Sequence, residues 1–203
     1  MRDGSVAGIV LAAGEAKRFG GCKQLARLRG KPLLQWVLGA ALDSNLDAVI
    51  LVLGSCHRKI QSVLGTELAH PRLQIVVNPD FASGQSTSLK IGLERVRDDY
   101  SAAMFLLADQ PFITSGLINR LRTSFLRSSR RIAVPVFQGR RGNPCIFEHS
   151  LYPELGRITG DRGARELIRA HPGDVLEVQV SDPSVCRDID VPGDLDRFTE
   201  NAR

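Results

Sequence analysis

Short apolar runs, each about the length of one β-strand, recur along the whole chain and are separated by segments with a helical pattern. In the segment that follows Pro32, for example, apolar residues return at helical spacing at Leu33, Val37 and Ala41. Strands that alternate with helices are typical of a Rossmann-like, doubly wound α/β fold, so we expect a mostly parallel sheet with helices on both faces. The expected strands cover residues 8–11, 49–53, 73–77, 102–107, 132–137 and 175–180.

Polar residues mark the starts of two further helices. The run Ser86-Thr87-Ser88 is expected to open one of them, and Thr114 is expected to cap the other. The 203 residues, 43% of them hydrophobic, suit one domain over residues 1–203 that buries a core without disulfides or metals. The four scattered cysteines form no pattern for zinc or for a disulfide framework.

The charge and hydropathy of the chain limit its partners. A net charge of +5 suits a polyanion or a triphosphate substrate. The basic stretch at residues 120–131 has Phe125 as its one aromatic residue, so it indicates a solvated helix face and not a nucleic-acid surface. No apolar stretch approaches the roughly 20 residues that span a bilayer. We therefore expect a cytoplasmic protein that binds neither nucleic acid nor membrane.

The segment LAAGEAKRFGGCK, residues 11–23, follows the first apolar run directly. Its glycines permit close approach of a ligand to the backbone, and Arg18 and Lys23 add cations beside exposed N–H groups. Phosphate or carboxylate oxygens need this combination. Neither a Walker A loop nor a G-x-G-x-x-G dinucleotide motif can be spelled here, so the segment predicts an anion-binding loop of another type.

Two other polar segments follow apolar strands. NPDFASGQSTS, residues 78–88, comes after the third expected strand, and LADQP, residues 107–111, comes after the fourth. Ligands of doubly wound sheets bind at the carboxyl ends of the strands. We therefore expect all three loops to converge at one edge of the sheet and to form one site.

Five segments together resemble the MobA-like nucleotidyltransferase family, and within it the molybdenum cofactor cytidylyltransferase branch. They extend over nearly the whole chain and stand in the order found in the family. They are LAAGEAKRFGGCKQL (11–25), NPDFASGQSTSLKIGL (78–93), LLADQP (106–111), GDRGARELI (160–168) and DIDVPGDL (188–195).

This resemblance implies a fold of the nucleotide-diphospho-sugar transferase type and a reaction. CMP would pass from CTP to the terminal phosphate of molybdenum-molybdopterin, with release of pyrophosphate. Arg18 and Lys23 would bind the triphosphate and, with Asp109, form the catalytic group. Asp109 and Asp190 would hold Mg²⁺, because carboxylate and phosphate oxygens make the hard shell that this ion prefers. A recipient molybdoenzyme is then a candidate partner.

The same resemblance implies the nucleotide-binding residues. LAAG is similar to the cytidylyl branch, whereas guanylyl-transferring relatives usually have L-A-G-G; the methyl group of Ala13 would narrow the space beside the base. Gly84 would permit close approach of the backbone, and the hydroxyl of Ser88 would bond the base or ribose. The full set comprises Leu11, Ala12, Ala13, Gly14, Arg18, Lys23, Gly84 and Ser88.

The acceptor is less well defined, and four alternatives stay open. Asn143 stands where the family commonly has histidine, so other phosphomonoesters remain candidate acceptors. Arg140 and Arg141, expected in a flexible loop, could supply cations to an anionic pterin or could be a solvated surface pair. A non-catalytic carrier of molybdenum cofactor is a second alternative. A hydrolase with Ser86 as nucleophile, which lacks the last glycine of G-x-S-x-G, and an oxidoreductase, which lacks a dinucleotide motif, are the others.

Overall fold

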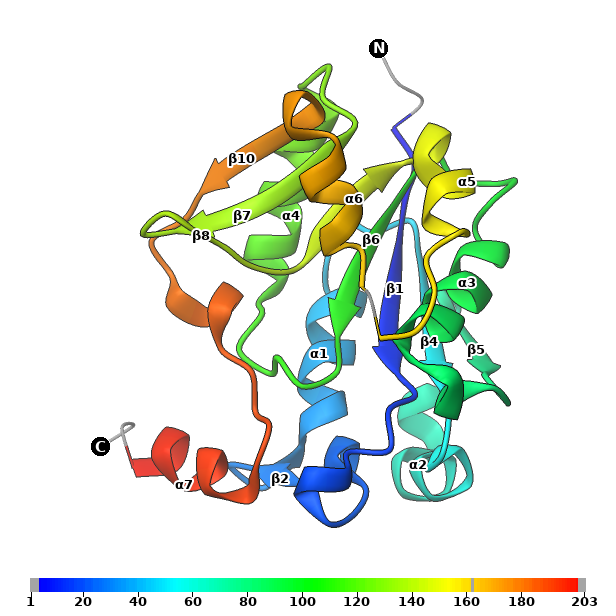
Figure 1. Ribbon diagram of the computed structural model, residues 1–203. Coiled ribbons are helices and arrows are strands. Elements are labelled where there is room, and N and C mark those ends of the chain that lie inside the picture. The colour runs from blue at the N-terminus through cyan, green and yellow to red at the C-terminus, as the bar shows by residue number, and fades with distance from the viewer. Residues whose placement is uncertain (1–3, 162, 201–203) are drawn as a thin grey trace.

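The computed structural model describes residues 4–161 and 163–200 (Figure 1). Within this part of the chain, eight strands form one mixed sheet in the order β5-β4-β1-β6-β9-β7-β10, with β8 paired to β7. These strands are β1 (Val6–Ala12), β4 (Ala48–Leu53), β5 (Leu73–Val77), β6 (Ala102–Leu107), β7 (Ile132–Phe137), β8 (Arg140–Arg141), β9 (Cys145–Glu148) and β10 (Val175–Gln179). The short strands β2 (Arg27–Leu28) and β3 (Lys31–Pro32) form a separate antiparallel pair.

The pairing confirms the expected doubly wound, mostly parallel sheet. The central strand β1 is parallel to both β4 and β6, β5 continues the parallel set beyond β4, and β10 is parallel to β7. All six expected strands are present. The strand β9 was not expected; it lies antiparallel between β6 and β7, and its few apolar residues directly follow Pro144.

The helices begin close to the predicted positions. Pro32 precedes α1, α3 begins at Gln85, one residue before the expected start, and the Thr114 hydroxyl accepts a hydrogen bond from the Leu117 N–H (3.2 Å) at the start of α4. The helices are α1 (Leu33–Leu42), α2 (His57–Leu64), α3 (Gln85–Glu94), α4 (Ser115–Leu126), α5 (Tyr152–Leu155), α6 (Arg165–Ala170) and α7 (Pro192–Glu200). In the described ranges, none of them is both long enough and apolar enough to span a bilayer.

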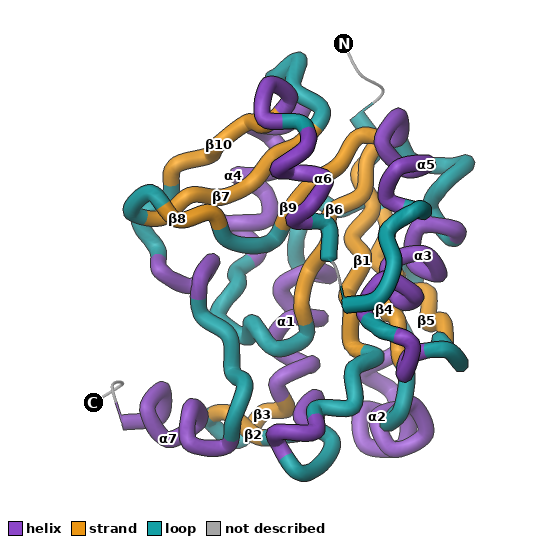
Figure 2. The backbone as a smooth tube through the Cα atoms, in the orientation of Figure 1, coloured by secondary structure: helices purple, strands orange, loops and turns teal. Residues whose placement is uncertain are grey.

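Two hydrophobic layers cover the two faces of the sheet, and helices lie in front of and behind the strands in Figure 2. Side chains of successive strand residues point to opposite faces, so Val10 belongs to one layer and Ile9 to the other. The layer of Val10 includes residues from α1, α2 and α4, and the layer of Ile9 includes residues from α3, α5 and α6. Burial on both faces explains why the strands are continuous apolar runs.

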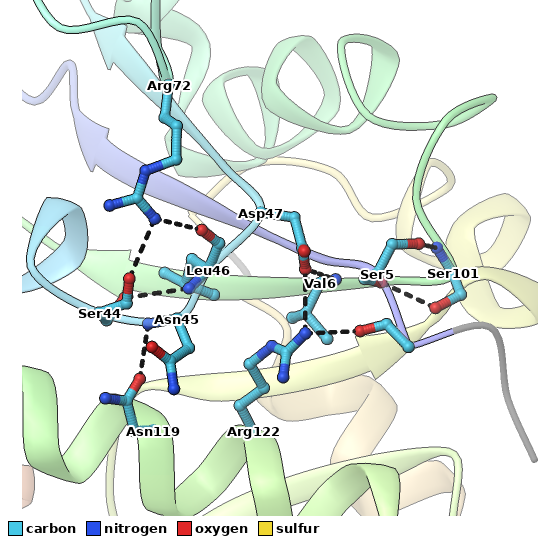
Figure 3. Close-up of polar contacts among 11 residues, drawn as sticks. Ser5, Val6, Ser44, Asn45, Leu46, Asp47, Arg72, Ser101, Asn119 and Arg122 are labelled. Carbon is cyan, nitrogen blue, oxygen red and sulfur yellow. Dashed lines mark hydrogen bonds and ion pairs between the residues drawn. The ribbon is translucent and has the colours of Figure 1, made fainter.

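A polar network fixes the amino ends of the central strands (Figure 3). The Asp47 carboxylate accepts hydrogen bonds from the Val6 N–H (2.7 Å) and from Nη2 of Arg122 (3.2 Å). The Ser101 hydroxyl donates to the Ser5 carbonyl (2.7 Å), and the Ser101 N–H donates to the Ser5 hydroxyl (3.1 Å). These bonds hold the entries to β1, β4 and β6 together. The opposite edge, at the carboxyl ends, is where the polar loops lie.

Candidate nucleotide-binding site

A cavity of about 420 Å³ opens at the carboxyl ends of β1 and β6. The first loop, the second loop and the residues after β6 all contribute to its walls, so the three segments converge as expected. Among the residues predicted for the site, the lining contains Leu11, Ala12, Ala13, Gly14, Lys23, Gly84, Ser88 and Asp109. Arg18 is exposed on the short helix η1 (Lys17–Phe19) and lies outside this lining.

The ammonium group of Lys23 joins the two predicted metal ligands. Its Nζ lies 3.0 Å from Oδ2 of Asp109 and 3.1 Å from Oδ1 of Asp190. Lys23 begins the short helix η2 (Lys23–Leu25), Asp109 follows β6, and Asp190 precedes α7. The Lys23 side chain is 13% exposed, so this ion pair is largely shielded from water, although the Asp190 side chain is 46% exposed.

Asp190 reaches the site because the neighbouring backbone is anchored. Ile189 is fully buried against Leu28 and Leu33, and its N–H donates to the Asp109 carbonyl (2.9 Å). The Asp194 carboxylate accepts from the N–H groups of Asp190 (2.8 Å) and Val191 (3.0 Å), as expected for a helix cap. These two backbone donors hold the pKa of Asp194 below its usual value.

The surroundings of Asp109 fit a divalent cation. Its Oδ1 atom is buried and has no hydrogen-bond partner, whereas Oδ2 contacts Lys23. Burial raises the pKa of the Asp109 carboxyl, and the nearby Lys23 charge opposes that rise. Residues 4–161 and 163–200 contain no cluster of three or more carboxylate, histidine or cysteine side chains placed for a metal. A bound Mg²⁺ would therefore combine the carboxylates of Asp109 and Asp190 with oxygens from phosphate and water.

Gln24 is a site residue that the sequence analysis missed. Its side chain is 6% exposed, and Nε2 donates to the carbonyls of Ala12 (2.9 Å) and Gly14 (3.0 Å). One amide group thus fixes the turn that follows β1. No sequence pattern identifies such a residue, because glutamine next to lysine is ordinary surface composition and only the fold buries it.

The second loop contacts the GDRG segment at the start of α3. A Cβ built on Gly84 would lie 2.5 Å from the carbonyl carbon of Gly160, and the Gly84 φ of +108° also favours glycine. The N–H groups of Ser86 and Gln85 donate to the Gly160 carbonyl (3.1 Å) and to Oδ1 of Asp161 (3.3 Å), respectively. The close approach predicted for Gly84 is thus made by another part of the chain, and Asp161 joins the cavity lining.

The Ser88 hydroxyl, which was predicted to bond the base or ribose, has a hydrogen-bond partner within the protein. The Ser88 side chain is buried at the cavity wall, and its hydroxyl oxygen accepts from Nδ2 of Asn78 (2.9 Å). The hydroxyl hydrogen is therefore directed elsewhere and can be donated. Ala13 is 4% exposed, and a Cβ built on Gly54 would lie 2.8 Å from the Ala13 methyl group, so this methyl packs toward the turn after β4.

A second cavity of about 220 Å³ adjoins the first. The two share Leu11, Gln85, Leu107 and Asp161 in their walls. The second extends toward Asn143 at the turn before β9 and toward Arg165 at the start of α6, with apolar walls from Leu89, Phe105 and Ile168. Cys145 also lines it, and burial raises the pKa of this thiol to about 12.

The structure corrects the expectation for Arg140 and Arg141. They form the short strand β8, antiparallel to β7, instead of a flexible loop. Nε of Arg141 pairs with Glu177 (2.8 Å), and neither arginine lines the two adjoining cavities. The strand pairing explains the difference, because Gln138 and Gly139 adopt positive φ and turn the chain back onto β7. Among the described residues, the cation that lines the second cavity is Arg165, which the sequence analysis did not single out.

Comparisons with known proteins agree with this geometry. Residues 8–175 match the model of the MobA-like NTP transferase domain. The chain is 30% identical to purine catabolism protein PucB of Bacillus subtilis, with 97% of each chain covered. It is 31% identical to nicotine blue oxidoreductase of Paenarthrobacter nicotinovorans, with 91% of this chain and 92% of that protein covered. Identity to the molybdenum cofactor cytidylyltransferase of Escherichia coli is 24%, with 95% and 96% covered.

Solved structures give the same result. Rv0371c of Mycobacterium tuberculosis superposes with a TM-score of 0.82 at 27% identity, covering 97% of this chain and 98% of that one. The structure of that protein in complex with manganese superposes with a TM-score of 0.80 at 26% identity, covering 98% and 100%. The fold also matches 4-diphosphocytidyl-2C-methyl-D-erythritol synthase of Anaerococcus prevotii, with a TM-score of 0.76 at 14% identity over 98% of this chain and 96% of that one, so it is of the expected nucleotide-diphospho-sugar transferase type. The matched domain, the fold and the converging loops agree: the chain belongs to the MobA-like NTP transferase family and is a nucleotidyltransferase.

Proposed function

We propose that this nucleotidyltransferase transfers CMP from CTP to the terminal phosphate of molybdenum-molybdopterin and releases pyrophosphate. The observation that carries the proposal is the pair of adjoining cavities. The first is lined by a glycine-containing loop, Lys23 and Asp109, which suit a nucleoside triphosphate and its metal. The second combines apolar walls with Arg165, which suits a flat acceptor that carries a phosphate.

In the first cavity, positioning and charge neutralisation are the main requirements of the reaction. The backbone from Ala12 to Gly14, fixed by Gln24, would hold the nucleotide against the end of β1. Lys23 would neutralise charge that develops on the leaving pyrophosphate. Arg18, which is exposed at the edge of the loop, would reach the outer phosphates.

Mg²⁺ is the proposed cofactor, and Asp109 and Asp190 would hold it. When bound, it would neutralise phosphate charge and make the α-phosphorus more susceptible to attack. The unpartnered Oδ1 atom of Asp109 supports this role. The manganese complex of Rv0371c supports a divalent cation in a protein of the same fold.

In the second cavity, the acceptor phosphate would lie near Gln85, which both cavities share, and the guanidinium of Arg165 would offset its charge. A phosphate monoester with a second pKa near 6 is largely dianionic at neutral pH, so its oxygen attacks without a protein base. The new bond joins that oxygen to the α-phosphorus, and the bond to the pyrophosphate oxygen breaks. Asn143 and Cys145 would contact the ring system of the acceptor.

The Escherichia coli relative is a molybdenum cofactor cytidylyltransferase, and its name supports the cytidylyl reaction. Its sequence identity to this chain is lower, however, than that of PucB or nicotine blue oxidoreductase, whose names give other roles. Two alternatives therefore stay in the test. One is transfer to another phosphomonoester, which Arg165 would serve equally well. The other is a non-catalytic carrier of molybdenum cofactor.

Identification of the labelled product tests the proposal. The protein is incubated with α-labelled CTP, Mg²⁺ and either molybdenum cofactor or a panel of sugar and polyol phosphates, with Asp109→Asn as the inactive control. We expect label in a cytosine dinucleotide of the pterin. Label in a sugar or polyol phosphate alone would overturn the molybdopterin assignment, and no labelled product with any acceptor would favour the carrier.

A further inference from the structure

The Lys23 ammonium group occupies the space between the two carboxylates that would hold the metal. Its Nζ is 3.0 Å from Asp109 and 3.1 Å from Asp190. A divalent cation held by the same two carboxylates would lie in this space, and two cations cannot share it. The protein without nucleotide thus carries its own cation at the metal position.

We propose that Lys23 keeps the metal site closed until a triphosphate arrives. The phosphates then attract the ammonium group away from the carboxylates, and the divalent cation enters with the nucleotide. This inference deepens the proposed function and rests on it for the identity of the two metal ligands. It predicts that the nucleotide-free protein binds divalent cations weakly and that Lys23 is the cause.

Charge balance explains why such an internal cation is needed. Without Lys23, the negative charges of Asp109 and Asp190 would face each other at an edge where the Asp109 side chain is only 29% exposed, which is costly for the ionised carboxyls. A third carboxylate, that of Asp188, acts electrostatically on Asp109 and accepts a hydrogen bond from Nε2 of Gln110 (2.5 Å). Lys23 therefore offsets one of the two negative charges that would otherwise attract a metal ion.

The same geometry permits a divalent cation to replace the Lys23 ammonium group at the two carboxylates. Oδ1 of Asp109 has no partner, so that carboxylate keeps an acceptor for an incoming cation. Lys23 also lines the cavity that would hold the triphosphate, so a rotation of its flexible side chain would carry Nζ from the carboxylates to the phosphates. The backbone of η2 would not need to move.

Manganese binding without nucleotide tests the inference. Free Mn²⁺ is measured by electron paramagnetic resonance during titration of wild type, Lys23→Met and Lys31→Met. Lys31→Met removes the same charge elsewhere, where the ammonium lies over the Trp36 ring. We expect Lys23→Met to bind Mn²⁺ about tenfold or more tightly than wild type, and Lys31→Met to match wild type.

Equal Mn²⁺ affinity of wild type and Lys23→Met would overturn the inference, as would equal tightening in Lys31→Met. Lys23→Gln provides a second neutral variant if Lys23→Met does not fold. A measurement on wild-type crystals needs no variant: we expect anomalous manganese density between Asp109 and Asp190 with CTP and Mn²⁺, and none with Mn²⁺ alone. Density with Mn²⁺ alone would overturn the inference. None of these readouts requires an acceptor or turnover, so failure of the proposed reaction would be seen separately in the product assay.

Discussion

Gly84 and Gly160 meet backbone to backbone, and the residues that follow them, Gln85 and Asp161, line both cavities. A Cβ on Gly84 would lie 2.5 Å from the carbonyl carbon and 2.6 Å from the carbonyl oxygen of Gly160. The Gly160 carbonyl in turn accepts from the Ser86 N–H at the start of α3. The walls that the two cavities share thus depend on a contact that leaves no room for a side chain on Gly84.

Gly84→Ala should therefore destabilise the protein and weaken nucleotide binding. The positive φ and the clash with backbone atoms together should cost roughly 1–3 kcal/mol of the free energy of unfolding. Urea denaturation measures this cost. Gly193→Ala is the matched control, because that glycine is exposed and a Cβ there would meet nothing within 4 Å. Equal free energies of unfolding for Gly84→Ala and Gly193→Ala would contradict a tight contact between Gly84 and Gly160.

Asp109→Asn should reduce Mg²⁺-dependent turnover at least roughly a hundredfold and leave the fold intact, because it removes one charge from the proposed metal site. Pyrophosphate release measures turnover, and circular dichroism checks the fold. Chelation of divalent cations should abolish wild-type activity in the same assay. Asp99→Asn, a change at an exposed carboxylate, should behave as wild type. Undiminished release by folded Asp109→Asn would contradict the assigned role.

Gln24→Leu should raise the KM for the nucleotide about tenfold or more, with a smaller effect on kcat. The change leaves the carbonyls of Ala12 and Gly14 without their side-chain donor, which should also cost about 1–3 kcal/mol of stability. Steady-state kinetics with varied CTP separates KM from kcat. Gln61→Leu on the exposed face of α2 is the control. A loss of kcat alone would indicate that Gln24 does not act by positioning the loop.

CTP should raise the melting temperature in the presence of Mg²⁺ more than GTP does, because a ligand that binds the native state stabilises it by mass action. Differential scanning fluorimetry at equal nucleotide concentrations measures the two shifts. Ala13→Gly should reduce the difference between them. A larger shift with GTP would overturn the cytidylyl assignment and leave the transferase assignment unchanged.

The thiols of Cys22 and Cys145 should react slowly with iodoacetamide at pH 8. Burial raises the pKa of each to about 12, so only about one molecule in ten thousand carries the reactive thiolate at that pH. The fraction should rise about tenfold with each pH unit while the pH stays below the pKa. Peptide mass spectrometry should find Cys56 and Cys186 labelled first, and all four labelled at similar rates in urea. Early labelling of Cys145 in the native protein would contradict its burial.

The sequence by itself determined six strands of the sheet and the edge at which the site lies. Strands buried on both faces must be apolar throughout, so their positions are visible as apolar runs, and the ends of parallel strands place the first loop, the second loop and Asp109 together. The strand β9 was not predicted, because its four residues, which follow a proline, are too few to show a periodic pattern of apolar side chains.

Only the tertiary structure decided how the site is held together. Lys23 and Asp190 are 167 residues apart, and they meet because Ile189 is buried against Leu28 and Leu33, a contact with no local pattern. The role of Gln24 depends on its burial beneath the first loop, and the pairing of Gly84 with Gly160 depends on two loops that touch only in the folded chain. Local periodicity records which residues are buried in an element, whereas contacts between loops arise from the packing of whole elements and leave no such record in the sequence.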